Sequence, residues 1–201
     1  MTFIFACAGA GLLVAALVVR GTGKPGRHLT SPEHHMFVLV RALTYATAFI
    51  AFLLVFVPGR ILERSGITQP PALGPVELAG VAVGLLGAVL TVWCILTFAL
   101  AGRGTPAPFD PPRRLVVRGP YRYLRNPMYL GAFIALGGAA MVYRSIPLAG
   151  YAGLFLLATH LFVVWYEEPT LAHLFGEEYQ RYRAEVRRWL PRTRGFVDNL
   201  N

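Results

Sequence analysis

The chain alternates long apolar runs with short polar segments, a pattern typical of a protein that crosses a lipid bilayer several times. Five apolar runs are candidates for membrane spans, although the fourth would give only about 24 Å of helix. After Pro169 the chain is polar overall but repeats apolar side chains at helical spacing, with arginines between them. This last pattern predicts an amphipathic helix at the membrane surface. We therefore expect one all-α membrane domain, residues 1–201, with spans at about 2–19, 36–57, 78–100, 128–143 and 148–165.

The composition agrees with a membrane protein. The 201 residues are 55% hydrophobic and 14% charged, whereas a soluble domain carries about 25% charged residues. A net charge of +9 could favour nucleic acid, but the basic residues flank apolar runs, so we expect no nucleic-acid partner. Cys7 and Cys94 both lie in apolar runs, and two such residues are too few for a disulfide framework or a metal site.

The basic residues also predict an orientation. If the N-terminus lies outside, the inner face receives three basic residues after the first span, six after the third and six in the C-terminal tail. The outer face keeps only Arg60, Arg64 and Arg144. This asymmetry follows the positive-inside rule. We therefore expect an integral protein, of a bacterial inner membrane, with the N-terminus outside and the C-terminus in the cytoplasm.

The polar segment Ala101 to Leu130 is richer in specialised side chains than a connection between two helices requires. It carries six arginines, three tyrosines and the pair Gly102-x-Gly104. Asn126-Pro127 predicts a helix start, with the asparagine side chain capping the free amides. The positive end of that helix would suit an anionic group, although the asparagine could also cap the helix and do nothing else.

A second polar segment, Tyr166-Glu167-Glu168-Pro169, ends the fifth apolar run. Two carboxylates there are costly unless they are solvated, paired or functional. We expect Pro169 to bend the chain at Glu168, so that one carboxylate points into the protein while the other serves the bend or an arginine. The alternative is a solvated pair that ends a span. His160 lies on the same helix face as Glu167 and either lines the same cavity or is a hydrogen-bonded packing residue.

These two segments resemble the signatures of the integral-membrane methyltransferases, which include isoprenylcysteine carboxyl methyltransferases and phosphatidylethanolamine N-methyltransferases. Residues 118–131 read RGPYRYLRNPMYLG, which is similar to the first signature of that superfamily. Glu167-Glu168-x-x-Leu171, then FGEEY at 175–179 and Leu190-Pro191, is similar to the second. The resemblance covers the chain from Gly102 to Pro191.

The resemblance implies a site for S-adenosylmethionine, within residues 101–191 and open to the cytoplasm. Glu167 matches the carboxylate that faces the reacting substrate. By the same resemblance the cofactor would be held by Gly102, Gly104, Arg113, Leu115, Val116, Tyr121, Asn126, Pro127, Met128, Tyr129 and Glu168. The implied partners are the lipid bilayer and a lipophilic acceptor.

Two departures bear on the acceptor. Asn126 stands where the carboxyl methyltransferases usually have histidine, and Val163 stands where they have an arginine that helps to hold the substrate. Without that arginine a carboxylate would lose a bidentate partner, so we expect a lipid amine. Methylation of a carboxyl or thiol group on a hydrophobic molecule is the alternative. The remaining alternatives are a non-enzymatic membrane protein, such as a transporter or assembly factor, and a membrane reductase that uses a nicotinamide cofactor.

Overall fold

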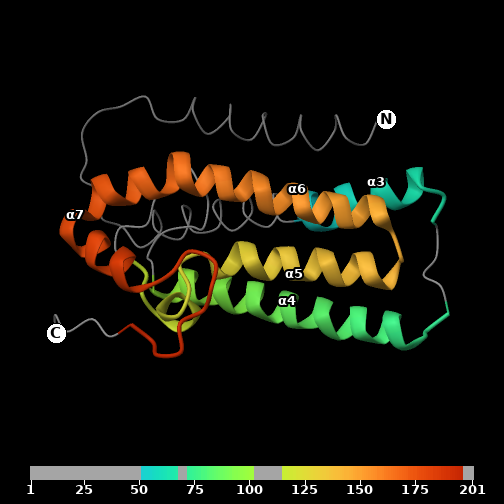
Figure 1. The fold of residues 1–201 in the computed structure, drawn as a ribbon, viewed down its shortest axis with the longest axis horizontal. Coiled ribbons are helices and arrows are strands. Elements are labelled where there is room, and N and C mark those ends of the chain that lie inside the picture. Colours follow the sequence, from blue (N-terminus) through green and yellow to red (C-terminus); the bar gives the residue numbers. More distant parts are fainter. Residues whose placement is uncertain (1–50, 68–71, 102–114, 197–201) are drawn as a thin grey trace, which may run out of the picture. The chain divides into compact units, whose positions relative to one another are not determined.

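A computed structural model describes residues 51–67, 72–101 and 115–196, and within these ranges all regular structure is helical. The first predicted span and most of the second lie outside the described residues. The elements, coloured along the sequence in Figure 1, are η1 (Phe52–Phe56), α3 (Val57–Arg64), α4 (Pro75–Ala101), η2 (Gly119–Arg122), α5 (Pro127–Val142), α6 (Ile146–Phe162), η3 (Val163–Glu167) and α7 (Glu168–Glu185).

Two helices of the described chain are long and apolar enough to cross a membrane. One is Pro75–Thr97 within α4, with a mean hydropathy of 2.3, and the other is the helical segment Ile146–Glu185, with 1.8. α5 is apolar but has only 16 residues. The predicted third, fourth and fifth spans thus correspond to α4, α5 and α6. The helix at the second predicted span continues beyond Val57 to Arg64, and the end of the span itself stays a prediction.

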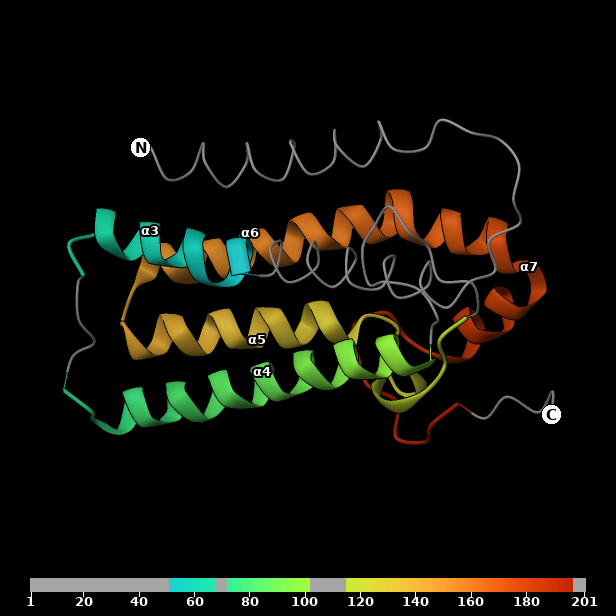
Figure 2. The ribbon, with the colours of Figure 1, turned by 180° about the vertical axis from the view of Figure 1, so that it is seen from behind.

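α4 and α5 pack side by side at very short range because glycines face each other (Figures 1 and 2). A Cβ atom added to Gly138 of α5 would lie 2.3 Å from the backbone nitrogen of Gly84 in α4. A Cβ added to Gly87 would lie 2.4 Å from the nitrogen of Ala135. Small residues allow membrane helices to approach this closely, and the resulting contacts between backbones stabilise the pair.

The end of the α4–α5 pair farthest from the predicted site is fixed by polar contacts. Glu77 accepts a hydrogen bond from the Gly74 N–H at 2.9 Å and forms an ion pair with Arg144, in the turn between α5 and α6. The hydroxyl of Ser145 accepts a hydrogen bond from the Leu148 N–H at 3.3 Å and so caps α6. These contacts join the start of α4 to the α5–α6 hairpin.

The helix that begins as α6 continues through the π-helix η3 into α7, and Pro169 does not bend it. Glu168 has helical dihedral angles, φ −63° and ψ −44°, and its N–H bonds to the Val163 carbonyl. The predicted bend at Glu168 was therefore wrong. The π-turn places Pro169 in the first turn of α7, where a missing N–H costs little. The chain changes direction instead at Gly176, whose φ of 48° and ψ of −123° are not helical.

The aromatic stripe of α7 packs inside the protein. Tyr179, Tyr182 and Val186 form a buried cluster with Phe196 from the C-terminal tail. Leu174, in contrast, is 49% exposed. A helix was predicted here, and its position at the membrane surface stays a prediction. Its buried side chains cover residues of the tail and of the loop that begins at Leu115.

Candidate functional site

The loop before α5 is attached to the end of α4. Val116 and Tyr121 form a buried cluster with Cys94 of α4, and Met128 packs against it. Gly119 has a φ of +55°, and a Cβ there would lie 2.9 Å from the Thr97 hydroxyl. A residue with a side chain would therefore be both strained and too close to α4.

Asn126 and Pro127 start α5, but the asparagine side chain does not cap the helix as the sequence indicated. Pro127 occupies the first turn, as predicted, and both residues are buried. The Asn126 side chain makes no capping hydrogen bond. Its amide instead donates to the Arg188 carbonyl at 3.4 Å, so the predicted side-chain cap was wrong. Asn126 joins the start of α5 to the C-terminal tail.

Tyr129 and Glu167 meet across the gap between α5 and η3. The Tyr129 hydroxyl donates to Oε2 of Glu167 at 3.1 Å. Tyr129 lies in the first turn of α5, and Glu167 is the last residue of the π-helix. π-turns inserted into longer helices occur frequently at functional sites, because they change the direction of side chains relative to a regular helix. The other Glu167 oxygen has no hydrogen bond to a protein group within the described ranges.

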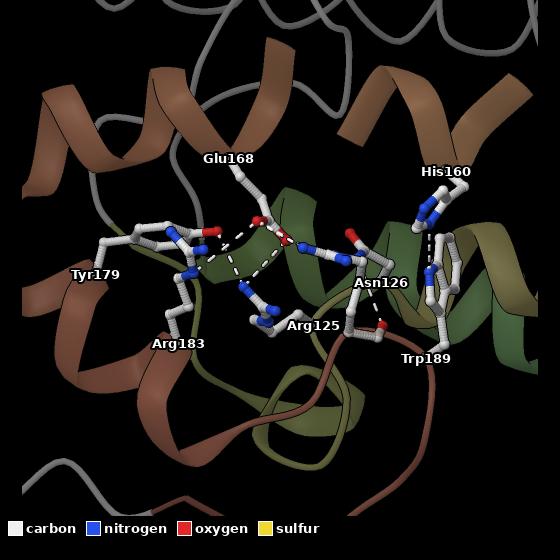
Figure 3. Close-up of polar contacts among 8 residues, drawn as sticks. Arg125, Asn126, His160, Glu168, Tyr179, Arg183 and Trp189 are labelled. Carbon is white, nitrogen blue, oxygen red and sulfur yellow. Dashed lines mark hydrogen bonds and ion pairs between the residues drawn. The ribbon is translucent and has the colours of Figure 1, made fainter. Parts of the chain in front are cut away.

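Glu168, the next residue, points into a cluster of arginines (Figure 3). Arg188 binds both of its oxygens, with Nε at 2.7 Å and Nη2 at 2.9 Å. Arg125 approaches to 3.1 Å and Arg183 to 4.0 Å. Glu168 is only 6% exposed, and a buried carboxylate is costly without such partners. Three guanidinium groups around one carboxylate leave the cluster with excess positive charge.

Arg125 is also held by Tyr179, whose hydroxyl accepts from Nη1 at 3.4 Å. Its Nε is buried and has no hydrogen-bond partner among the residues that the structure describes. Buried donors are nearly always satisfied, so this atom lacks the acceptor that most buried donors have. Hydrogen bonding to Glu168 raises the pKa of Arg188, which therefore stays charged.

Tyr121 lies near both Tyr129 and Glu167. Burial, and then the nearby Cys94, Glu167 and Tyr129, raise the pKa of its phenol well above the ordinary value. The phenol is therefore neutral and can donate a hydrogen bond. The Tyr121 backbone carbonyl accepts from the Tyr182 hydroxyl at 2.7 Å, which connects this loop to α7.

His160 does not meet Glu167 as a second site group. Its Nδ1 accepts a hydrogen bond from the indole Nε1 of Trp189 at 3.0 Å (Figure 3). Of the two interpretations offered by the sequence, the packing histidine is the one observed. Trp189 belongs to the C-terminal tail, so α6 is also connected to that tail.

The structure brings most of the described candidate residues to one end of the three packed helices α4, α5 and α6. Glu167, Tyr129 and Tyr121 lie together, with Glu168 beside them. Leu115 packs against the α7 cluster, while Val116 and Met128 support Tyr121. Gly102, Gly104 and Arg113 lie outside the described residues. From the sequence we expected an arginine near one of the two glutamates, but not the particular partners Arg125, Arg183 and Arg188. These residues lie 43, 15 and 20 positions from Glu168, and no fixed spacing signals such contacts.

Val163, where related carboxyl methyltransferases have arginine, is 1% exposed. It is the first residue of η3 and lies one turn before Glu167. An apolar group therefore occupies this position, and it supplies no charge for an anionic acceptor.

Comparison with known protein families identifies the chain. The family model "Phospholipid methyltransferase" matches residues 76–178, a range that contains α4 from its second residue onward, α5, α6 and both carboxylates of the site. Neither a curated protein nor a solved structure matches the chain. The matched segment spans half of the sequence and coincides with the helices that carry the site, and the protein belongs to the phospholipid methyltransferase family.

Proposed function

We propose that the protein transfers a methyl group from S-adenosylmethionine to the amine of a membrane lipid at the cytoplasmic face. In this proposal five helices span the membrane, at about residues 2–19, 36–57, 78–100, 128–143 and 148–165, with the N-terminus outside. The family match supports methyl transfer to a lipid-type substrate. The acceptor, the cofactor and the membrane face are inferences from the residues of the site.

The observation that carries the proposal is the contact between Tyr129 and Glu167. Glu167 lies two residues beyond the predicted end of the fifth span, at Trp165, and Tyr129 holds one of its oxygens in place. The second oxygen is available to a ligand. A carboxylate at this depth attracts a cation, and a protonated lipid amine is a cation that reaches the site from the bilayer.

The described residues also fit S-adenosylmethionine. This cofactor has a carboxylate, and the Nε of Arg125, which has no partner among the described residues, is a buried donor that a carboxylate would satisfy. Leu115, Val116, Tyr121, Asn126, Pro127, Met128 and Tyr129, with Glu168 behind them, remain the proposed surroundings of the cofactor, together with Gly102, Gly104 and Arg113.

Each residue then has a defined task. The cofactor supplies a methyl group on a sulfonium centre, which an amine nitrogen can take in one displacement that leaves a neutral thioether. Glu167 attracts the lipid ammonium and accepts its proton at Oε1, which frees the nitrogen lone pair. Tyr129 fixes the Glu167 carboxylate through Oε2. The α5–η3 contact thereby orients the acceptor, and orientation supplies much of the rate of a displacement reaction.

Calorimetry on purified protein tests the cofactor assignment. We expect S-adenosylmethionine to bind and Tyr129→Ala to weaken binding at least about tenfold, which is roughly 1.4 kcal/mol. Tyr143→Ala, at the opposite end of α5, is the matched control and should leave binding unchanged. Binding of NADPH, without binding of S-adenosylmethionine, would contradict the proposal.

A further inference from the structure

The C-terminal tail makes a large share of the contacts at the site, although it lies beyond the segment that matches the family. We call residues 186–196 the C-terminal strap. It has no regular secondary structure, yet three main-chain hydrogen bonds join it to the loop before α5. The Arg125 N–H donates to the Arg187 carbonyl at 3.0 Å, the Arg192 N–H to Tyr123 at 2.9 Å, and the Phe196 N–H to Arg122 at 2.9 Å.

Side chains of the strap reach the helices that carry the site. Arg188 binds both oxygens of Glu168, at the start of α7. Trp189, the next residue, donates to His160 of α6. At the far end of the strap, Phe196 is buried edge-on against the ring of Tyr182. The strap therefore contacts α6, α7 and the loop before α5 at once.

We propose that Arg188 is a positioning residue of the methyl-transfer site, and that it acts through Glu168 to hold Glu167 toward Tyr129. This inference rests on the proposed function for its effect on turnover. It assigns to the strap a part in catalysis that the family match does not cover.

The geometry distinguishes Arg188 from the other two arginines. Arg125 and Arg183 each approach a single Glu168 oxygen, at 3.1 and 4.0 Å. Arg188 engages both oxygens through two nitrogens, and a two-point contact fixes the orientation of a carboxylate as well as its distance. Because Glu167 and Glu168 are consecutive residues at the η3–α7 junction, fixing one side chain limits the rotation of the helix that carries the other.

The positive charge of Arg188 has a second effect on the Glu167 carboxylate. Glu167 is surrounded by Tyr129 from α5, Tyr121 from the preceding loop, Tyr179 and Tyr182 from α7, and the neighbouring Glu168. Glu168 is the only other carboxylate of this set. Removing Arg188 leaves its negative charge less compensated, which disfavours the ionised form of Glu167.

A double-mutant cycle tests the proposal. We expect Arg188→Ala to lower kcat for the lipid acceptor about tenfold, and Glu168→Gln to do the same. If Arg188 acts through Glu168, the double variant is no slower than the slower single variant. Arg188→Lys keeps the charge but loses the two-point contact, so its kcat should lie between those of the wild type and Arg188→Ala. In Arg188→Ala, the KM for S-adenosylmethionine should change less than threefold.

Arg192→Ala is the matched control. Arg192 lies on the same strap, and its side chain pairs with the exposed Glu185 at 2.9 Å, a surface contact that contributes little. The kcat of Arg192→Ala should equal that of the wild type. Equal losses of kcat in Arg188→Ala and Arg192→Ala would overturn the proposal. A loss of about a hundredfold in the double variant of Arg188→Ala and Glu168→Gln would also overturn it, because the two single losses would then be independent.

Hydrogen exchange separates this inference from the proposed function. The Arg125 amide, which bonds to Arg187, should exchange at least about tenfold faster in Arg188→Ala and at the wild-type rate in Arg192→Ala. This measurement needs no turnover. A wild-type protein that transfers no methyl group would end the proposed function, while faster exchange would still show that Arg188 anchors the site. Unchanged exchange in Arg188→Ala would contradict the positioning role whether or not the protein is active.

Discussion

Replacing Glu167 with glutamine removes one negative charge while keeping the size of the side chain. The amide oxygen of glutamine can still accept the hydrogen bond that Tyr129 donates at 3.1 Å, so we expect the contact between α5 and η3 to persist. The ability to attract an ammonium group and to take its proton is lost. The Glu167→Gln variant therefore isolates the chemical role of the carboxylate from its structural role.

General base catalysis contributes about 10²- to 10⁴-fold in enzymes that depend on it. Part of that contribution can be replaced by water, so we predict a loss of at least about tenfold, equivalent to roughly 1.4 kcal/mol of transition-state stabilisation. Cofactor binding should remain almost normal, because the proposed contacts with the cofactor lie mainly in the loop before α5 and in its first turn.

The assay is methyl transfer to the native lipid acceptor, with kcat and KM measured separately and cofactor binding measured by calorimetry. Glu177→Gln is the matched control, because Glu177 is an exposed residue of α7 and its loss changes the net charge equally. We expect the control to turn over at the wild-type rate. Full turnover in Glu167→Gln would show that this carboxylate is structural and would refute the reasoning.

Two further predictions concern the fold. Gly138→Ala should lower the free energy of unfolding by about 1–3 kcal/mol, because its Cβ would meet the backbone of α4. Gly137→Ala is the control: an added Cβ there has nothing within 4 Å, so this variant should be neutral or stabilising. Equal effects of the two variants in denaturant titrations would contradict the close packing. Cysteines placed at Arg114 and Arg192 should react with reagents on the cytoplasmic side, and a cysteine at Arg64 on the opposite side; labelling of positions 64 and 114 from the same side would exclude five spans.

The helices of the hairpin could be predicted from the sequence because their signals are local. Apolar runs, the proline at the start of α5 and the polar turn before α6 set their limits to within a few residues. The predicted bend at Glu168 failed for a local reason that hydrophobic spacing does not reveal. A π-turn precedes Pro169 and places it in the first turn of α7, and the direction changes later, at Gly176.

The candidate site was predictable in its main residues but not in its connections. Glu167 and Tyr129 were both expected at the site from the two signatures, and the structure shows them in contact. Asn126 was expected to cap a helix, but its amide binds a carbonyl 62 residues later. The pairing of His160 with Trp189 likewise joins residues 29 positions apart. Such contacts depend on how the strap folds back over the loop, and a single sequence carries no periodic signal for that.

Methyl transfer to a lipid is the measurement that tests the central claim most directly. Purified protein in a bilayer is incubated with methyl-labelled S-adenosylmethionine and a total lipid extract, and mass spectrometry locates the labelled atom. The account predicts label on the nitrogen of a lipid amine, and at most about a tenth of the wild-type label when Glu167→Gln protein is assayed for the time of a single wild-type turnover. Label on a carboxyl or thiol group, or no transfer by the wild type to any lipid, would contradict it.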